Sequence, residues 1–94
     1  MKKQADKIDS DFLAIKSLFE SGNVKKIRLL EEQAPTKMSK ALGLNYNSYL
    51  EKLRNPEKFT IKHILLICKL CQLNPNLVFE TIRTEVESQI KIKV

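Results

Sequence analysis

The chain has 94 residues, of which 43% are hydrophobic and 30% charged, and these values are typical of one small globular domain. Two glycines and three prolines leave little room for a turn-rich β-fold, and the longest apolar run, residues 64–68, is far shorter than the about 20 residues that span a bilayer. The net charge of +6 favours an anionic partner such as nucleic acid. The first ten residues lack the apolar segment of a signal peptide, so we expect a cytoplasmic protein with reduced thiols and no membrane partner.

Apolar residues recur at helical spacing along the chain and predict consecutive helices. We expect one helix from about residue 8 or 10 to 21, one from 24 to about 33, two within 35–54, one after Thr60, and one from Asn74-Pro75 onward. The residues expected on buried faces are Ile8, Phe12, Ile15 and Phe19, then Val24, Ile27 and Leu30, then Ile61, Ile64, Leu65 and Cys68, and finally Val78, Phe79, Ile82 and Val86.

Residues 35–59 carry the most informative pattern. A short helical pattern runs into Gly43, a polar turn follows, and a second helical pattern begins at once. Glycine accepts the left-handed backbone that such a sharp reversal needs. This is the outline of a helix-turn-helix, whose second helix can enter the major groove of DNA. The apolar residues expected to face one another across the turn are Met38, Ala41 and Leu42 on the first helix and Leu50 and Leu53 on the second.

The free side of the second motif helix follows from its angular spacing. At about 100° per residue, Tyr46 falls beside Leu50 and Leu53, so we expect it to pack with them. Ser48, Glu51, Lys52 and Asn55 point the opposite way, with Asn47 and Tyr49 on the flanks. Side chains of these types pair with base edges and phosphates, although an ordinary amphipathic helix with a solvated polar face gives the same pattern.

Several short motifs occur in a familiar order. They are Leu42-Gly43-Leu44 at the turn, Leu50 and Leu53 on the second helix, Arg54-Asn55-Pro56 in the loop, and Leu73-Asn74-Pro75 before the last helix. With these motifs, residues 24–82 resemble the lambda-repressor-like (Cro/XRE-type) family of helix-turn-helix domains. The chain departs from that pattern at three points. Ser39 replaces the usual alanine, Pro56 replaces the loop glycine, and one extra residue lies between Gly43 and the apolar pair of the second helix.

The resemblance implies an all-α, compact five- or six-helix domain with an extra N-terminal helix. Within a single domain, residues 1–22 would be that extra helix, 23–83 the helix-turn-helix core with its motif at 35–54, and 84–94 the last helix end and tail. It also implies sequence-specific binding of double-stranded DNA, as in a transcriptional regulator. The residues expected to read bases are Asn47, Ser48, Tyr49, Glu51 and Lys52, and those expected to meet the DNA backbone are Thr36, Lys37, Arg54, Asn55 and Lys58.

An alternative is a protein-interaction module that keeps this fold but has lost DNA binding. Acidic residues near the motif reduce its positive electrostatic potential and keep this alternative open. They are Glu31, Glu32, Glu51 and Glu57.

Cys68-x-x-Cys71 has the spacing of a redox pair or half a zinc site. Both cysteines sit in the middle of a helical pattern, and no second pair completes a zinc site, so we expect them in the core. His63, the only histidine, is expected at the surface. No set of catalytic residues is visible, and we therefore expect neither an enzyme nor a cofactor or metal ion.

The last helix extends beyond the unit that the family resemblance covers. Its apolar stripe of Phe79, Ile82, Val86 and Ile90 would be partly exposed on a monomer, which suggests a homodimer held mainly by this helix. The first helix could contribute to that interface or could cover the same stripe within one chain.

Overall fold

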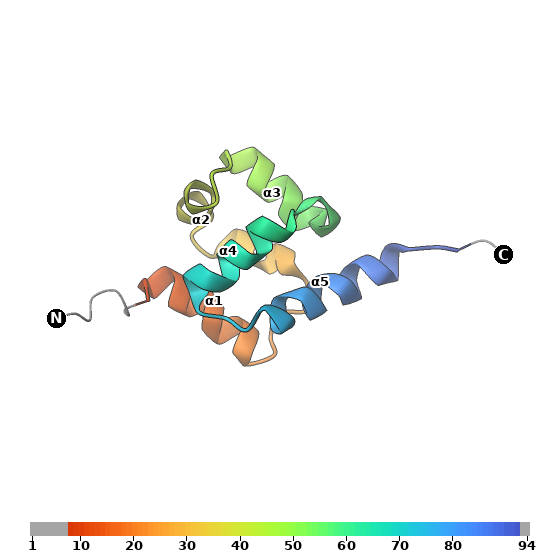
Figure 1. The fold of residues 1–94 in the computed structure, drawn as a ribbon, viewed down its shortest axis with the longest axis horizontal. Helices are drawn as coiled ribbons and strands as arrows, with labels where there is room; N and C mark the ends of the chain where they lie inside the picture. The colour runs from red at the N-terminus through yellow and green to blue at the C-terminus, as the bar shows by residue number, and fades with distance from the viewer. Residues whose placement is uncertain (1–7, 93–94) are drawn as a thin grey trace.

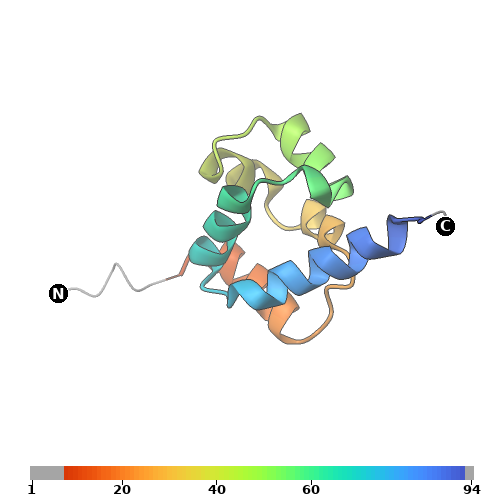
Figure 2. The ribbon, with the colours of Figure 1, turned by 45° about the vertical axis from the view of Figure 1, so that its right-hand side comes forward.

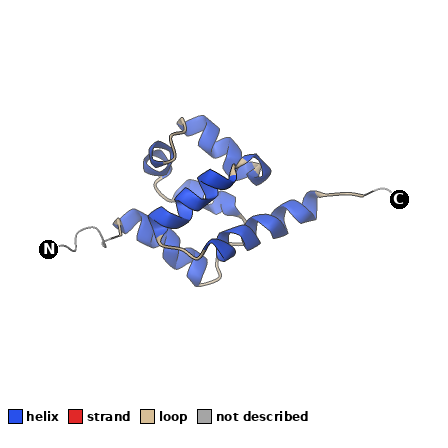
Figure 3. Ribbon diagram, viewed as in Figure 1, coloured by secondary structure: helices blue, strands red, loops and turns tan. Residues whose placement is uncertain are grey.

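The computed structural model describes residues 8–92, which form five α-helices and two 3-10 helices and contain no strand. The elements are α1 (Ser10–Glu20), η2 (Ile27–Glu32), α2 (Pro35–Ala41), α3 (Tyr46–Arg54), η3 (Pro56–Lys58), α4 (Ile61–Cys71) and α5 (Pro75–Gln89) (Figures 1 and 3). The expected all-α fold is confirmed. Among the described residues, no helix has both the length and the apolar character needed to cross a lipid bilayer.

Local sequence explains where most α-helices begin. The side chains of Asp9, Asn45, Thr60 and Asn74 each accept a hydrogen bond from a backbone N–H in the first turn of α1, α3, α4 and α5. Such caps satisfy donors that the helix itself cannot pair. Proline is compatible with the first position of a helix, where its missing N–H is not needed, and it opens both α2 and α5.

The helix α1 belongs to the same core as the rest of the chain. Its Phe12, Ile15 and Phe19 are buried, and it packs against α4 and α5. The three aromatic and aliphatic side chains therefore find their partners within one chain. The other buried hydrophobic residues are Val24, Ile27, Leu30, Met38, Leu42, Tyr49, Leu53, Phe59, Ile64, Ile67, Cys68, Cys71, Leu73, Val78 and Ile82.

The expected α-helix from residue 24 to about 33 is wrong in its type and its start. The segment is a 3-10 helix that begins at Ile27, after Lys26 in an extended conformation. Val24, Ile27 and Leu30 are all buried, as expected, and within η2 the spacing of Ile27 and Leu30 matches the three-residue repeat of a 3-10 helix. The side chain of Glu85 in α5 accepts a 3.2 Å hydrogen bond from the backbone N–H of Ile27, which ties η2 to the last helix.

Two apolar residues of α4 do not lie where the periodic pattern placed them. Ile61 and Leu65 are exposed, and the buried face consists of Ile64, Ile67, Cys68 and Cys71. Because α4 is apolar around most of its circumference, periodicity cannot rank its faces. Packing against α1 and α5 selects the buried one.

The apolar stripe of α5 is largely covered by its own chain. Ile82 is buried, while Phe79 and Val86 are half-buried and pack against the core. The exposed apolar residues at this end of the chain are Ile90 and Ile92, which follow the helix.

Candidate nucleic-acid interface

The helices α2 and α3 pack against each other at one edge of the molecule (Figures 1 and 2). Gly43 lies between them with a φ of +74°, the left-handed conformation expected for this glycine. The backbone N–H of Leu44 donates a 2.9 Å hydrogen bond to the carbonyl of Ser39, which closes the turn. Met38 and Leu42 of α2 are buried as expected, whereas Ala41 is exposed.

Tyr49 and Leu53 form the buried side of α3, and neither side chain is accessible to solvent. Tyr49 packs edge-on against Phe59, with ring centroids 6.4 Å apart. Tyr46 is 46% exposed. The expectation that Tyr46 packs in the core and Tyr49 reads bases is therefore wrong for both tyrosines.

The exchange of the two tyrosines has a simple cause. Tyr46, Tyr49 and Leu53 lie within about 60° of one another around the helix axis, so angle alone does not separate them. Their positions along the helix axis separate the two tyrosines. Tyr46 is the first residue of α3, while Tyr49 lies at its middle, where the helix packs over η2. Burial raises the pKa of the Tyr49 hydroxyl, and this hydroxyl has no hydrogen-bond partner among the described residues.

The solvent side of α3 carries a row of polar residues at four-residue spacing. Asn47, Glu51 and Asn55 are exposed, and Ser48 and Lys52 are half-buried beside them. The amide Nδ2 of Asn55 donates to the carbonyl of Glu51 at 3.2 Å, so part of its hydrogen-bonding capacity is used within the helix end. Asn47, Ser48, Glu51 and Lys52 thus lie on the side of α3 away from the buried Tyr49 and Leu53.

All three cations expected to meet the DNA backbone form ion pairs within the chain. Lys37 Nζ lies 3.0 Å from a carboxylate oxygen of Asp9 and 2.8 Å from one of Asp11. Arg54 Nε lies 2.7 Å from Glu31. The hydrogen bonds from Lys37 and Arg54 lower the pKa of Asp9 and Glu31, respectively. The hydrogen bonds to Asp11 and then Asp9 raise the pKa of Lys37, and the hydrogen bond to Glu31 raises that of Arg54.

The third pair lies on the candidate surface itself. Lys58 Nζ is 2.6 Å from a carboxylate oxygen of Glu51, and this contact lowers the pKa of Glu51 and raises that of Lys58. Lys52 Nζ is 3.4 Å from the backbone carbonyl of Lys58, so it bridges α3 and η3. Thr36, in the first turn of α2, is exposed.

Sequence reasoning missed these ion pairs because most of their partners are distant in the chain. Asp9 and Lys37 are 28 residues apart, and Glu31 and Arg54 are 23 apart. No local spacing rule connects them. All of these side chains except Glu31 are well exposed, so each pair contributes little to stability and exchanges readily with other ions.

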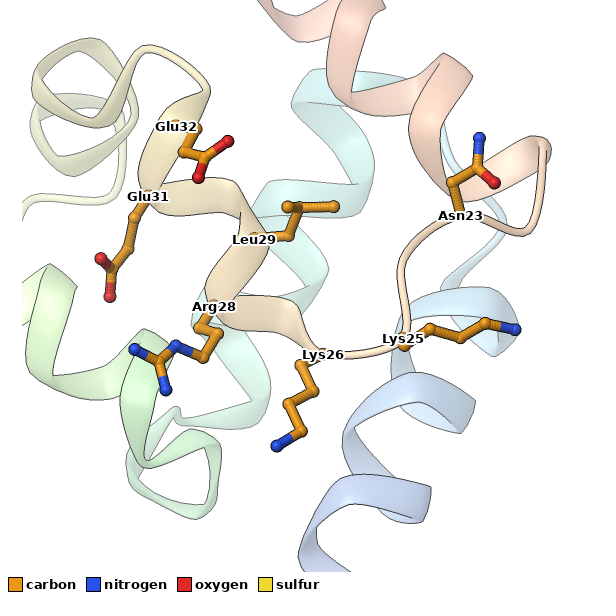
Figure 4. A pocket seen from close by; sticks show the side chains of 7 residues that line it. All are labelled: Asn23, Lys25, Lys26, Arg28, Leu29, Glu31 and Glu32. Atoms are coloured by element: carbon orange, nitrogen blue, oxygen red, sulfur yellow. The ribbon is translucent and has the colours of Figure 1, made fainter.

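A separate surface cavity of about 390 Å³ lies along η2 and not on the polar row of α3 (Figure 4). It carries basic and acidic side chains together, with Arg28 and Glu31 on the side of α3 and Lys25 on the side of α5 (Figure 4). Mixed charge of this kind does not select an anion. The lining residues are Asn23, Lys25, Lys26, Arg28, Leu29, Glu31 and Glu32.

The cysteines and the histidine have structural surroundings. Cys68 and Cys71 are free and buried, as expected, and burial raises the pKa of Cys71 to about 12. His63 is half-buried and not a plain surface residue, since its ring packs edge-on against Phe59 at 6.4 Å. Burial lowers the pKa of His63, and Lys52 and Lys62 lower it further. Within residues 8–92, no three side chains of the metal-binding types gather closely enough to hold a metal ion.

Comparisons with protein-family models, with curated proteins and with solved structures give no match. The arrangement of side chains around α3 is therefore the basis for a functional proposal.

Proposed function

We propose that this chain binds double-stranded DNA in a sequence-specific manner through α3, as a lambda-repressor-like transcriptional regulator. The observation that carries the proposal is the polar row of α3. Asn47, Glu51 and Asn55 point to solvent at an edge of the molecule, while Tyr49 and Leu53 anchor the opposite side. A helix held in this way can enter a major groove with its polar side facing the bases.

Each base-reading residue has a chemical role in this proposal. Asn47 can bond bidentately to adenine, Lys52 can donate to guanine or to a phosphate, and Glu51 can accept from the amino group of cytosine. Ser48 can bond to either a base or a phosphate. The partly buried stem of Lys52 supports a fixed position for its ammonium group.

The backbone contacts come from the two ends of the motif. Thr36 and Lys37 lie at the start of α2, and Arg54, Asn55 and Lys58 lie after the polar row. Phosphate oxygens can replace the carboxylates of Asp9, Glu31 and Glu51 as partners of the cations, because exposed ion pairs cost little to break. Binding would then release counterions and depend strongly on salt.

Selection of bound sequences from a random duplex pool tests this function, followed by affinity measurements on the selected site and on random duplex. Asn47→Ala should weaken binding to the selected site by about 1–3 kcal/mol and leave random duplex unchanged. Asn76→Ala, an exposed asparagine in the first turn of α5, is the matched control and should bind like the unmodified protein. A pool that yields no preferred sequence would count against the proposal.

A second candidate function is a protein-interaction module of the same fold. The observation that favours it is the intramolecular pairing of Lys37, Arg54 and Lys58, which reduces the positive field around α3. Failure to bind any duplex at low salt, together with a retained fold, would favour this function over DNA binding.

The proposed DNA-binding form is a homodimer on a two-fold site. One recognition helix reads only a few base pairs, and pairing two copies adds affinity and spacing selectivity. The surface that supports pairing lies at the end of α5, where Ile90 and Ile92 are 57% and 80% exposed.

A further inference from the structure

The helix α4 carries an apolar surface that no other element covers. Ile61 is 67% exposed and Leu65 is 45% exposed, one turn apart on the same side of the helix. In Figure 1, α4 crosses the front of the molecule with nothing drawn over it. A shallow groove of about 400 Å³ lies here, lined by Ile61, Lys62, Leu65, Leu66 and Lys69, and we call this surface the α4 face.

The two lysines of the α4 face determine which occupant fits. Lys62 and Lys69 are seven residues apart, so they lie two turns apart on the same side of α4, and both are exposed. Within residues 8–92 neither lysine forms an ion pair. A second copy laid antiparallel on this face would bring Lys62 of one copy against Lys69 of the other, and like charges would oppose that pairing. An occupant with carboxylates meets no such repulsion.

We propose that the α4 face docks an acidic amphipathic helix of a partner protein. Apolar residues of that helix, four positions apart, would contact Ile61 and Leu65, and its carboxylates would pair with Lys62 and Lys69. This is the helix-in-groove mode of recognition. The small apolar area implies weak, reversible binding, as in transient signalling contacts.

The proposal does not depend on DNA binding. The α4 face begins after η3 and uses none of the residues assigned to base reading or to the DNA backbone. A membrane with anionic lipids offers the same mixture of apolar and negative groups. Two exposed apolar side chains bury too little area to anchor a helix in it, so the protein partner is favoured.

The test uses the full chain with labelled methyl groups and two synthetic helical peptides. One peptide carries leucines at four-residue spacing flanked by glutamates, and its match carries lysines in place of the glutamates. The acidic peptide should shift the methyl signals of Ile61 and Leu65 in a saturable way, and the basic peptide should bind about tenfold more weakly. Leu65→Ser should abolish the shifts, whereas Leu77→Ser, an exposed leucine of α5, should leave them unchanged.

Charge reversal gives a second, independent readout. Lys62→Glu combined with Lys69→Glu should invert the preference so that the basic peptide binds better. The proposal is overturned by equal binding of both peptides or by shifts confined to other helices. It is also overturned by self-association that Leu65→Ser removes, or by Leu65-dependent binding to phosphatidylglycerol vesicles without any response to the acidic peptide.

Discussion

The Glu51 carboxylate on the solvent side of α3 accepts a 2.6 Å hydrogen bond from the Lys58 ammonium in η3. This pair places a negative charge in the middle of the proposed DNA-reading row and occupies a cation that could meet a phosphate. In the proposed DNA complex, the Glu51 carboxylate would repel phosphate and hold Lys58 away from it, so the pair should weaken non-specific binding until it separates.

Glu51→Gln should strengthen binding to random duplex at low salt by about threefold, because it removes a repulsive charge and releases Lys58. The plot of log affinity against log salt should become steeper by about one unit. Fluorescence anisotropy at several salt concentrations measures both quantities. Glu20→Gln, which removes the partner of Lys16 on α1, is the control and should change neither. An unchanged salt slope in Glu51→Gln would show that Lys58 does not contact phosphate.

Tyr49→Phe should leave DNA affinity unchanged and raise the free energy of unfolding by about 1 kcal/mol. The hydroxyl of Tyr49 is buried with no partner among residues 8–92, and an unpaired buried polar group costs about 1–3 kcal/mol. Thermal and denaturant unfolding measure the change. Tyr46→Phe alters an exposed tyrosine of the same helix and should leave stability nearly constant. Lower stability in Tyr49→Phe would mean that the hydroxyl has a bound water as partner.

The Glu31–Arg54 pair predicts a pH dependence of stability. The hydrogen bond from Arg54 lowers the pKa of Glu31 below its ordinary value of 4.5, so the folded state favours the charged carboxylate. The stability that the pair contributes is present above pH 4.5 and is lost as pH falls through the lower folded-state pKa. The melting temperatures of the unmodified protein and of Glu31→Gln should therefore differ by a small amount near neutral pH, because Arg54 is exposed, and converge in acid. A difference in melting temperature between the two proteins that stays the same at all pH values would exclude this role for Glu31.

Ile90→Ser combined with Ile92→Ser should convert a dimer into a folded monomer with weaker binding to a two-fold site. Both side chains are exposed, so the substitutions remove apolar surface without disturbing the core. Light scattering and affinity for full and half sites provide the measurement. Leu13→Ser, an exposed leucine of α1, should leave the oligomeric state unchanged. If the unmodified protein is a monomer at high micromolar concentration, the dimer proposal fails.

The helices could be predicted from the sequence where their signals are local. A cap such as Asn45 or Thr60 and a glycine such as Gly43 act within one turn, so neighbouring residues suffice to place a boundary. The 3-10 helix η2 could not be predicted in the same way. The backbone N–H of its first residue, Ile27, donates to the side chain of Glu85, which lies 58 residues further along the chain.

The candidate site was predictable in part for the same reason. Glu51 and Asn55 lie on the exposed side of α3 as spacing predicts, whereas Ser48 and Lys52, expected on the same side, are half-buried, and Asn47, expected on the flank, is exposed. Which tyrosine enters the core depends on how far η2 and Phe59 extend under α3, and that is a property of the assembled chain.

The hydrogen bond between Glu85 and Ile27 ties α5 to η2, and through η2 the last helix supports α3. The helix α5 holds the start of η2, η2 packs under α3, and α1 packs against α5. A fragment of residues 23–83 would keep every proposed DNA contact and still lose both Glu85 and the buried aromatic rings of α1. We therefore expect that the smallest piece of this chain able to hold the polar row of α3 in place is much longer than the motif that carries the row.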